Sequence, residues 1–308
     1  MIMNTSHAIQ RNLQHVSVGR PVTRGNISLF PVYVHGDQVN IPTGSQAGVV
    51  IGEKASAEVP TLEAENPTQQ PVLLVDGEIV TGGWQTRVLN VSVLVAPNGR
   101  IDIPVSCVEQ GRWHGGRAFD RKAMFAPRRV RRAKNATVAY NLLQSGLKRT
   151  DQGMVWDTVS AELARLDVHA SSGTLEAAAD RLADGDTLGR AAEELRRMGP
   201  LPQQCGVVIT HGSRVVSAEV FSSPEMLAAH WGAIVDAAIL DAPDTEPTSR
   251  PSASKVLRFL RRITEAEAAV SPGVGLGTEY HVRTPKFVAQ ALVHDDIVVH
   301  ASAFALAA

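Results

Sequence analysis

The chain has 308 residues, a formal net charge of −1, 44% hydrophobic residues and 20% charged residues. This length suffices for one large hydrophobic core or two smaller ones. The balanced charge excludes a whole-protein electrostatic field that would drive binding to nucleic acid or anionic lipid.

The chain begins with a polar N-terminal tail, residues 1–15, which lacks the apolar segment of a secretion signal. No apolar run elsewhere reaches membrane-spanning length, so we expect no membrane partner. The two cysteines, Cys107 and Cys205, are too few for a disulfide framework in so long a chain. These features predict a soluble, cytoplasmic protein, and the abundance of Ala, Val and Arg favours a bacterial source.

Residues 16–113 are predicted to form a β-rich part, because β-branched residues are frequent there and Gly, Pro, Asn and Asp separate the runs. Asp76-Gly77 predicts a hairpin with a type I′ turn between the strands on either side of it. The expected strands are Ile27–Val34, Gly48–Ile51, Val72–Val75, Val88–Val95 and Ile101–Val108.

Residues 97–99 predict a second hairpin, in which Gly99 takes the left-handed conformation and forms a bulge. The resulting register sets Arg87 opposite Glu109 at the end of an apolar stripe. Two interpretations of this pair stay open. It is either a structural ion pair that closes the hairpin, or part of a polar cluster with Arg112 at the mouth of a pocket.

Residues 114–200 are predicted to form a helical insertion, and residues 201–308 an α/β C-terminal part. Apolar residues at helical spacing, N-cap residues and terminating Gly and Pro residues indicate the helices. The expected helices are Gln152–Leu166, Thr174–Ala183, Thr187–Met198, a helix that starts at Pro224, and Ser254–Ala268.

Two similar segments, Val208–Phe221 and Ala291–Phe304, each predict a strand, a polar turn and a second strand. His294 and His300 flank the later turn, where we expect exposed imidazoles. We therefore predict a single α+β domain over residues 16–308, with antiparallel hairpins in its N-terminal part and C-terminal hairpins that join the sheet.

The segment Asp76–Trp113 resembles the domain family named for its association with ADP-ribosylglycohydrolases and rhodanese/phosphatase-superfamily proteins. The resemblance extends from about Val16 to Phe304, and it departs from the family pattern at Trp84 and Thr86. It implies a link to ADP-ribose or nucleotide metabolism, and so a nucleotide-like small molecule as ligand. The residues that carry it are Asp76, Gly77, Glu78, Gln85, Arg87, Asn90, Ser92, Pro104, Ser106, Cys107, Glu109, Gly111, Arg112 and Trp113.

The candidate site residues come from this segment. Glu109 is a candidate acid or base, and Cys107 a candidate nucleophile if a neighbouring cation lowers the pKa of its thiol. The candidate ligand-binding residues are Glu78, Gln85, Arg87, Arg112 and Trp113. Two interpretations of Arg112 and Trp113 stay open. They either clamp the phosphate and the base of a nucleotide, or Trp113 caps the core with Arg112 at its rim. The sequence predicts no metal and no cofactor, and it leaves open whether the protein is an enzyme.

The alternative function is a non-catalytic, self-assembling scaffold or protein-interaction module, in which the motif is structural. The basic segment Arg117–Lys134 bears on the choice of partner. We expect it to form a solvated basic helix, although binding to phosphates, nucleic acid or an acidic surface of a second subunit stays open.

Overall fold

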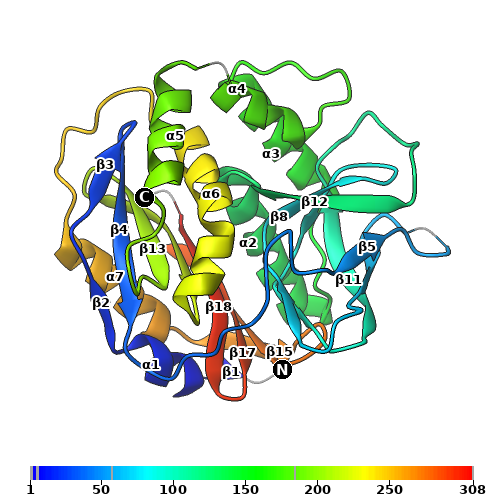
Figure 1. The fold of residues 1–308 in the computed structure, drawn as a ribbon, viewed down its shortest axis with the longest axis horizontal. Helices are drawn as coiled ribbons and strands as arrows, with labels where there is room; N and C mark the ends of the chain where they lie inside the picture. Colours follow the sequence, from blue (N-terminus) through cyan, green and yellow to red (C-terminus); the bar gives the residue numbers. More distant parts are fainter. Residues whose placement is uncertain (1–2, 5–6, 57, 184, 307–308) are drawn as a thin grey trace.

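Antiparallel sheets and helices combine in an α+β fold, as predicted (Figure 1). The structure is a computed structural model that describes residues 3–4, 7–56, 58–183 and 185–306. Figure 1 shows helices in front of a large sheet and a smaller group of strands at the right of the view. Much of the segment Asp76–Trp113 belongs to the smaller group of strands.

The large sheet takes strands from both ends of the chain. Its order is β1-β15-β16-β17-β18-β14-β13-β4-β2, and β3 pairs with β4. The strands are β1 (Met3–Asn4), β2 (Val16–Val18), β3 (Val22–Arg24), β4 (Ile27–Val34), β13 (Gly206–His211), β14 (Arg214–Phe221), β15 (Ala268–Pro272), β16 (Thr278–Arg283), β17 (Phe287–His294) and β18 (Ile297–Ala305). The two predicted C-terminal hairpins are confirmed as β13–β14 and β17–β18, which pair through β14 and β18.

The smaller group is a closed barrel with the order β11-β6-β5-β12-β8-β9. Its strands are β5 (Val50–Gly52), β6 (Thr61–Glu65), β8 (Glu78–Gly82), β9 (Arg87–Leu89), β11 (Arg100–Cys107) and β12 (Ala118–Phe125). Beside the barrel, β7 (Val72–Leu74) and β10 (Val93–Val95) form a two-stranded sheet.

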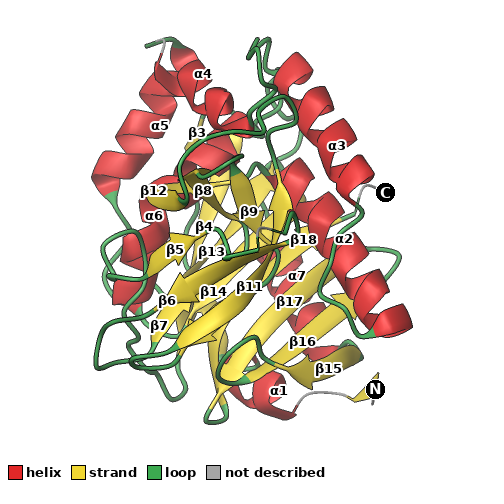
Figure 2. Cartoon of the chain, turned by 90° about the vertical axis from the view of Figure 1, so that its right-hand side faces the viewer, coloured by secondary structure: helices red, strands yellow, loops and turns green. Residues whose placement is uncertain are grey.

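Helices cover both faces of the large sheet (Figure 2). Helices α1 (His7–Leu13) and α7 (Ala253–Glu265) pack on one face, and α2 (Arg128–Ser145) and α6 (Pro224–Leu240) on the other. The remaining helices are α3 (Gln152–Arg165), the 3₁₀ turn Leu175–Ala179, α4 (Asp180–Ala183) and α5 (Thr187–Met198). None of the helices in the described part of the chain has the length and apolar character needed to cross a lipid bilayer.

Strand β4 shows why the large sheet needs two cores. Ile27 and Leu29 pack into the core shared with α6, whereas Phe30 and Val32 pack into the core beneath α7. Because successive side chains of a strand point to opposite faces, a strand buried on both faces is apolar almost throughout. This explains the continuous run ISLFPVYV, where a strand with one solvated face would alternate.

The hairpin predicted at Asp76-Gly77 is wrong. Strand β7 pairs with β10, whereas β8 pairs with β9 and β12, so the turn passes the chain from one sheet to the other. Among these two residues only Gly77 has a positive φ, of 84°, which excludes the type I′ turn that needs positive φ at both central positions. The carbonyl of Val75 accepts a hydrogen bond from Glu78 N at 3.1 Å and closes the turn.

The register predicted around residues 97–99 is also wrong. Asn98, with φ of 51°, takes the left-handed position instead of Gly99. The chain leaves the barrel after β9 at Asn90, whose N–H still bonds to the carbonyl of Pro104 at 3.0 Å. As a result β10 pairs with β7, and β11 meets β9 two residues out of the expected register, with Arg87 opposite Cys107.

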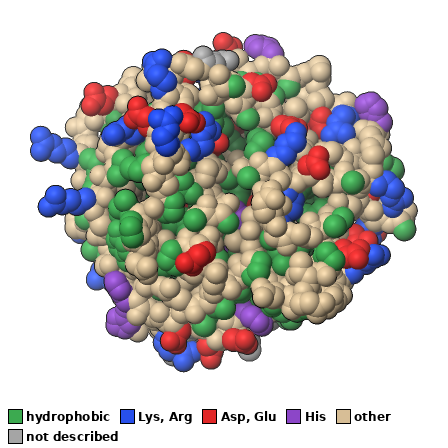
Figure 3. Space-filling view, in the orientation of Figure 1, with side chains coloured by type: hydrophobic (Ala, Val, Ile, Leu, Met, Phe, Trp, Pro, Cys, Tyr) green, Lys and Arg blue, Asp and Glu red, His purple; other side chains and the backbone are tan. Residues whose placement is uncertain are grey.

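Figure 3 shows basic, acidic and apolar side chains interspersed over one face of the molecule. This mixture agrees with the net charge of −1. The interior departs from the usual pattern of protein cores, because many charged side chains are buried there.

Candidate functional site

The motif residues Glu109 and Arg112 form a closed ion pair at one end of the barrel. Arg112 Nη2 lies 2.7 Å from Glu109 Oε2, and Arg112 Nε donates to Glu109 Oε1 at 3.0 Å. The same carboxylate accepts bonds from Thr86 N at 2.9 Å and from Ser172 Oγ at 2.7 Å. The pair therefore ties three loops together.

Arg112 has no N–H left for a ligand. Besides Glu109 it donates to the carbonyls of Gly83, His114 and Gly82, at 2.8, 3.1 and 3.1 Å. A guanidinium has five N–H donors, and these contacts use all five. Arg112 thus fastens the barrel rim, which we define as residues 82–86 and 109–117.

The carboxyl of Glu109 is ionised at neutral pH. Burial raises its pKa, but the hydrogen bonds from Arg112, Ser172 and Thr86 outweigh burial and hold the pKa at about 2. A general acid or base needs a pKa near the working pH. Glu109 in this state suits a structural anchor better than proton transfer.

Cys107 lies in the interior beside Gln85, with Sγ 3.1 Å from Gln85 Oε1. Burial raises the pKa of its thiol to about 11, although the nearby Arg87 acts in the opposite direction. The thiol is therefore protonated at neutral pH, and a protonated thiol is a poor nucleophile.

The predicted pair between Arg87 and Glu109 does not form. Arg87 Nη1 instead donates to the backbone carbonyl and the side-chain oxygen of Gln85, at 3.0 and 3.1 Å. Its nearest carboxylate is Glu53, at 3.9 Å. The physical reason is the register of β9 and β11, which sets Arg87 opposite Cys107.

Glu78 lies apart from the barrel rim, at the start of β8. Its carboxylate contacts Arg121 Nη2 at 2.8 Å, Val75 N at 2.9 Å and His230 Nε2 at 3.8 Å. Burial raises the pKa of Glu78, but favourable interactions, of which that with Arg121 is the largest, outweigh burial and hold the pKa below its usual value. The structure thus places Glu78 apart from the other predicted site residues. Gln85 joins Arg87 and Cys107 to Glu109, because its Nε2 donates to the carbonyl of Glu109 at 2.9 Å.

Trp113 is the one predicted site residue with a largely exposed side chain. It is 55% exposed, and Trp84 on the neighbouring loop is 42% exposed. The bonds from Arg112 to Gly82 and Gly83 hold these two loops together. The barrel rim therefore carries two exposed tryptophans, one on each of the two loops that Arg112 joins.

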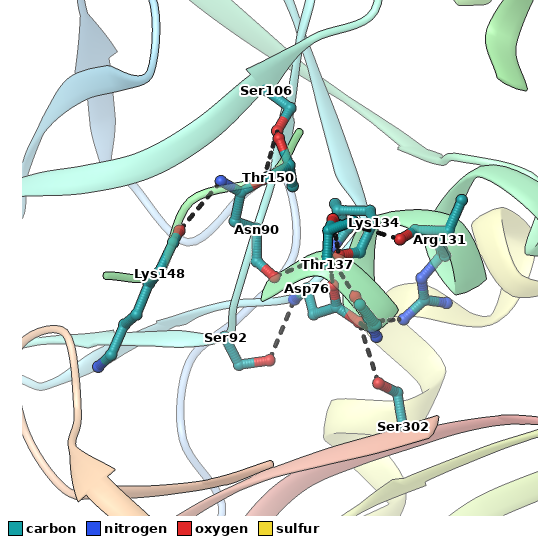
Figure 4. Close-up of polar contacts among 12 residues, drawn as sticks. Asp76, Asn90, Ser92, Ser106, Arg131, Lys134, Thr137, Lys148, Thr150 and Ser302 are labelled. Atoms are coloured by element: carbon teal, nitrogen blue, oxygen red, sulfur yellow. Dashed lines mark hydrogen bonds and ion pairs between the residues drawn. The ribbon is translucent and has the colours of Figure 1, made fainter. Parts of the chain in front are cut away.

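The sequence interpretation missed a buried charge network between the barrel, α2 and the large sheet (Figure 4). Arg131 and Lys134 of α2 both pair with Asp76, and Arg131 also pairs with Glu219 of β14. Lys134 Nζ further donates to the carbonyl of Asn90 at 2.7 Å. The four charged side chains of this network are all nearly inaccessible to solvent.

The network extends to β18 and to Ser92, which lies in the segment where the chain leaves the barrel after β9. Ser302 donates to Asp76 at 2.9 Å, and His300 lies 3.0 Å from Glu219 and 2.8 Å from the hydroxyl of Ser92. His300 is therefore buried, and its expected exposure is wrong. The turn of the hairpin lies at residues 295–296. His300 follows within strand β18, where its imidazole faces the network.

The network explains the segment Asp76-Gly77-Glu78. Asp76 neutralises α2 and Glu78 neutralises Arg121, so the two carboxylates serve different partners. Gly77 lies between them, and a Cβ there would stand 2.2 Å from Arg131 Nε. The guanidinium of Arg131 is also held between two aromatic rings, each 4.8 Å away.

The expected solvated helix at Arg117–Lys134 is wrong for its buried members. The segment divides into strand β12 and the first turns of α2, and Arg121, Arg128, Arg131 and Lys134 have buried side chains. A signal was present in the sequence. Residues 128, 131, 135, 138 and 142 recur at helical spacing, and the last two are the apolar Val138 and Leu142, so the basic residues share their buried face.

His230 yields a pH-dependent prediction. Its ring stacks on Phe125 and Phe221 at 5.4 and 5.3 Å, and burial lowers its pKa to about 4. The unfolded imidazole titrates near 6.5, so between these values the unfolded state binds more protons. The stabilising contribution is therefore complete above pH 6.5 and declines as the pH falls toward 4.

We expect His230 to account for a loss of about 2 kcal/mol in the free energy of unfolding between pH 7.5 and 5. Urea denaturation at both pH values measures it. In His230→Gln, which keeps a polar partner for Thr43, the loss over this range should shrink by about that amount. An unchanged pH dependence in the variant would contradict the buried neutral state of His230.

The described residues include no group of three or more His, Cys, Asp or Glu side chains arranged to hold a metal ion. Comparison with curated proteins gives no match, and comparison with solved structures gives none either. The family model described as the ARG and Rhodanese-Phosphatase-superfamily-associated Protein domain matches residues 15–304. This match covers nearly the whole chain and includes both the barrel and the large sheet, so the protein belongs to the family of ARG and Rhodanese-Phosphatase-superfamily-associated Protein domains.

Proposed function

We propose that the protein is a non-catalytic interaction module that associates through the barrel rim, with a second copy of the chain as its partner. The observation that supports this most directly is the saturation of Glu109 and Arg112 by each other and by the loops around them. The protonated thiol of Cys107 agrees with it. What the rim offers to a partner is the pair of exposed indoles, Trp84 and Trp113.

Exposed indoles suit this role because Trp is enriched among the residues that dominate binding energy at protein interfaces. Loss of one such residue typically costs about 2 kcal/mol or more of binding energy, which is about thirtyfold in affinity. We expect Trp84→Ala/Trp113→Ala to raise the dissociation constant of self-association at least about thirtyfold, as measured by sedimentation velocity over a concentration series.

Leu257→Ala is the matched control, because Leu257 is 43% exposed but lies on α7, away from the barrel rim. It should self-associate like the wild type. A wild-type chain that stays monomeric throughout the series would contradict the proposal, as would equal effects of the rim variant and the control.

A nucleotide-like ligand remains the second candidate, because an exposed indole face can stack on a base and because the family's name links it to ADP-ribosylglycohydrolases. Titration with ADP-ribose, followed by tryptophan fluorescence, separates the two. A saturable change in fluorescence that disappears in Trp113→Ala would favour the ligand. No change would leave the interaction module as the better account.

A further inference from the structure

Helix α7 and the ends of strands β14, β17 and β18 surround a cavity of about 320 Å³, which we name the α7 pocket. Ligand cavities in proteins typically begin at about this volume. The α7 pocket lies on the large sheet, on the face that α1 and α7 cover, and it is separate from the barrel rim. Its chemistry therefore has to be considered independently of the motif.

Four basic side chains line the α7 pocket. Lys255, Arg258 and Arg262 come from one face of α7, and Lys286 comes from the turn before β17. No described residue that lines the pocket is acidic. Like charges three and four residues apart on a helix repel each other and slightly destabilise it. No acidic side chain among the described lining residues therefore offsets the positive charge of the pocket.

The basic groups are also largely without partners. Lys255 donates to Ser213 Oγ at 2.8 Å. Within the described ranges, the side chains of Arg258, Arg262 and Lys286 form no ion pair and no hydrogen bond, whereas the neighbouring Arg261 pairs with Glu265 at 3.6 Å. Unlike Arg112, these guanidinium groups keep their N–H donors for a ligand.

The floor of the α7 pocket is apolar. Phe259 and Phe287 pack edge to face there, with their ring centroids 5.8 Å apart, and Val215 and Ala305 lie beside them. Basic groups around an apolar floor select a molecule that carries negative charge at one end and an apolar group at the other.

We propose that the α7 pocket binds a small phosphomonoester that carries an apolar group. A phosphomonoester holds a charge between about −1.5 and −2 at neutral pH, and two arginines can grip its oxygens with paired N–H donors. A single carboxylate would leave more of the positive charge uncompensated. The proposal involves binding alone, with no bond made or broken, and it does not depend on the function of the barrel rim.

Isothermal titration of the full chain with phenyl phosphate tests this. We expect saturable binding at least tenfold tighter than that of inorganic phosphate, because the phenyl ring covers the apolar floor. Arg258→Gln/Arg262→Gln should weaken the binding of phenyl phosphate at least tenfold. Val215→Ser should weaken it as well, but leave the binding of inorganic phosphate unchanged.

Arg261→Gln is the matched control, since it removes an arginine of the same helix that is already paired with Glu265. It should change the affinity less than twofold. The proposal is overturned if phenyl phosphate does not bind saturably at 10 mM, or if the control and the Arg258/Arg262 variant lose the same affinity.

Co-sedimentation with phosphatidylcholine vesicles containing phosphatidylglycerol is a second experiment. The proposal would also be overturned if the protein binds these vesicles through Arg258 and Arg262 but does not bind phenyl phosphate. The basic residues of α7 would then bind a membrane surface.

Discussion

Asp76→Asn is expected to lower the free energy of unfolding by about 3–5 kcal/mol, because the substitution leaves buried positive charge without its counterion. Asp76 lies between Arg131 and Lys134, and Lys134 is fully buried. Burial raises the pKa of the Asp76 carboxyl, but these two cations outweigh it and hold the pKa far below its usual value. Urea denaturation at pH 7.5 measures the loss.

The double variant Asp76→Asn/Lys134→Met tests whether charge is the cause. Removing both partners avoids the unpaired ammonium, so the double variant should be more stable than Asp76→Asn alone. Glu65→Gln is the surface control, because Glu65 pairs with Arg100 in the open, and its denaturation midpoint should not move. Equal losses in Asp76→Asn and the double variant would show that shape, and not charge, matters at Asp76.

Gly77→Ala is expected to destabilise the protein by about 2–5 kcal/mol, from two sources that add. A left-handed backbone conformation costs a residue with a Cβ about 1–2 kcal/mol, and overpacking costs about 1–3 kcal/mol more. The second source arises because the new Cβ would stand 2.2 Å from Arg131 Nε. Arg131 cannot withdraw, since Asp76 and Glu219 hold its guanidinium from two sides.

Gly146→Ala separates the two sources. Gly146 ends α2 with φ of 71°, close to the 84° of Gly77, but nothing lies within 4 Å of its Cβ position. In the same denaturation experiment, Gly146→Ala should lose only the cost of the left-handed backbone, about 1–2 kcal/mol in the free energy of unfolding. If both variants lose equal stability, the close approach of Arg131 to Gly77 has no energetic importance.

Much of the fold could be predicted because local signals agreed with it. The helix that starts at Pro224 has Ser223 as its N-cap, and the two C-terminal hairpins repeat one pattern. The failures lie where partners come from distant parts of the chain. No local pattern shows that β7 pairs with β10, or that the chain leaves the barrel between β9 and β10. Asn90 and Ser92 lie in that segment, and their side chains form hydrogen bonds inside the protein.

The candidate site was harder to predict for a related reason. The segment around Glu109 and Arg112 has the residue types of a ligand site, but the same types make a saturated structural joint, and only their hydrogen-bond partners distinguish the two. Thr86 and Ser172, which complete the shell of Glu109, carry no sequence signal of that role. The proposed site on α7 lies on the helix expected at Ser254–Ala268, but its pocket also depends on Lys286 from another element.

The pairing of β4 with β13 has a consequence for how the chain folds. The first strands of the large sheet end at Val34, yet β4 pairs with a strand that begins only at Gly206. Until β13 is available, one edge of β4 has no strand partner, whereas the barrel strands all lie within residues 50–125. Contacts between such distant segments slow folding, so the barrel should form early during synthesis and the large sheet should close late, with β4 exposed to aggregation in between.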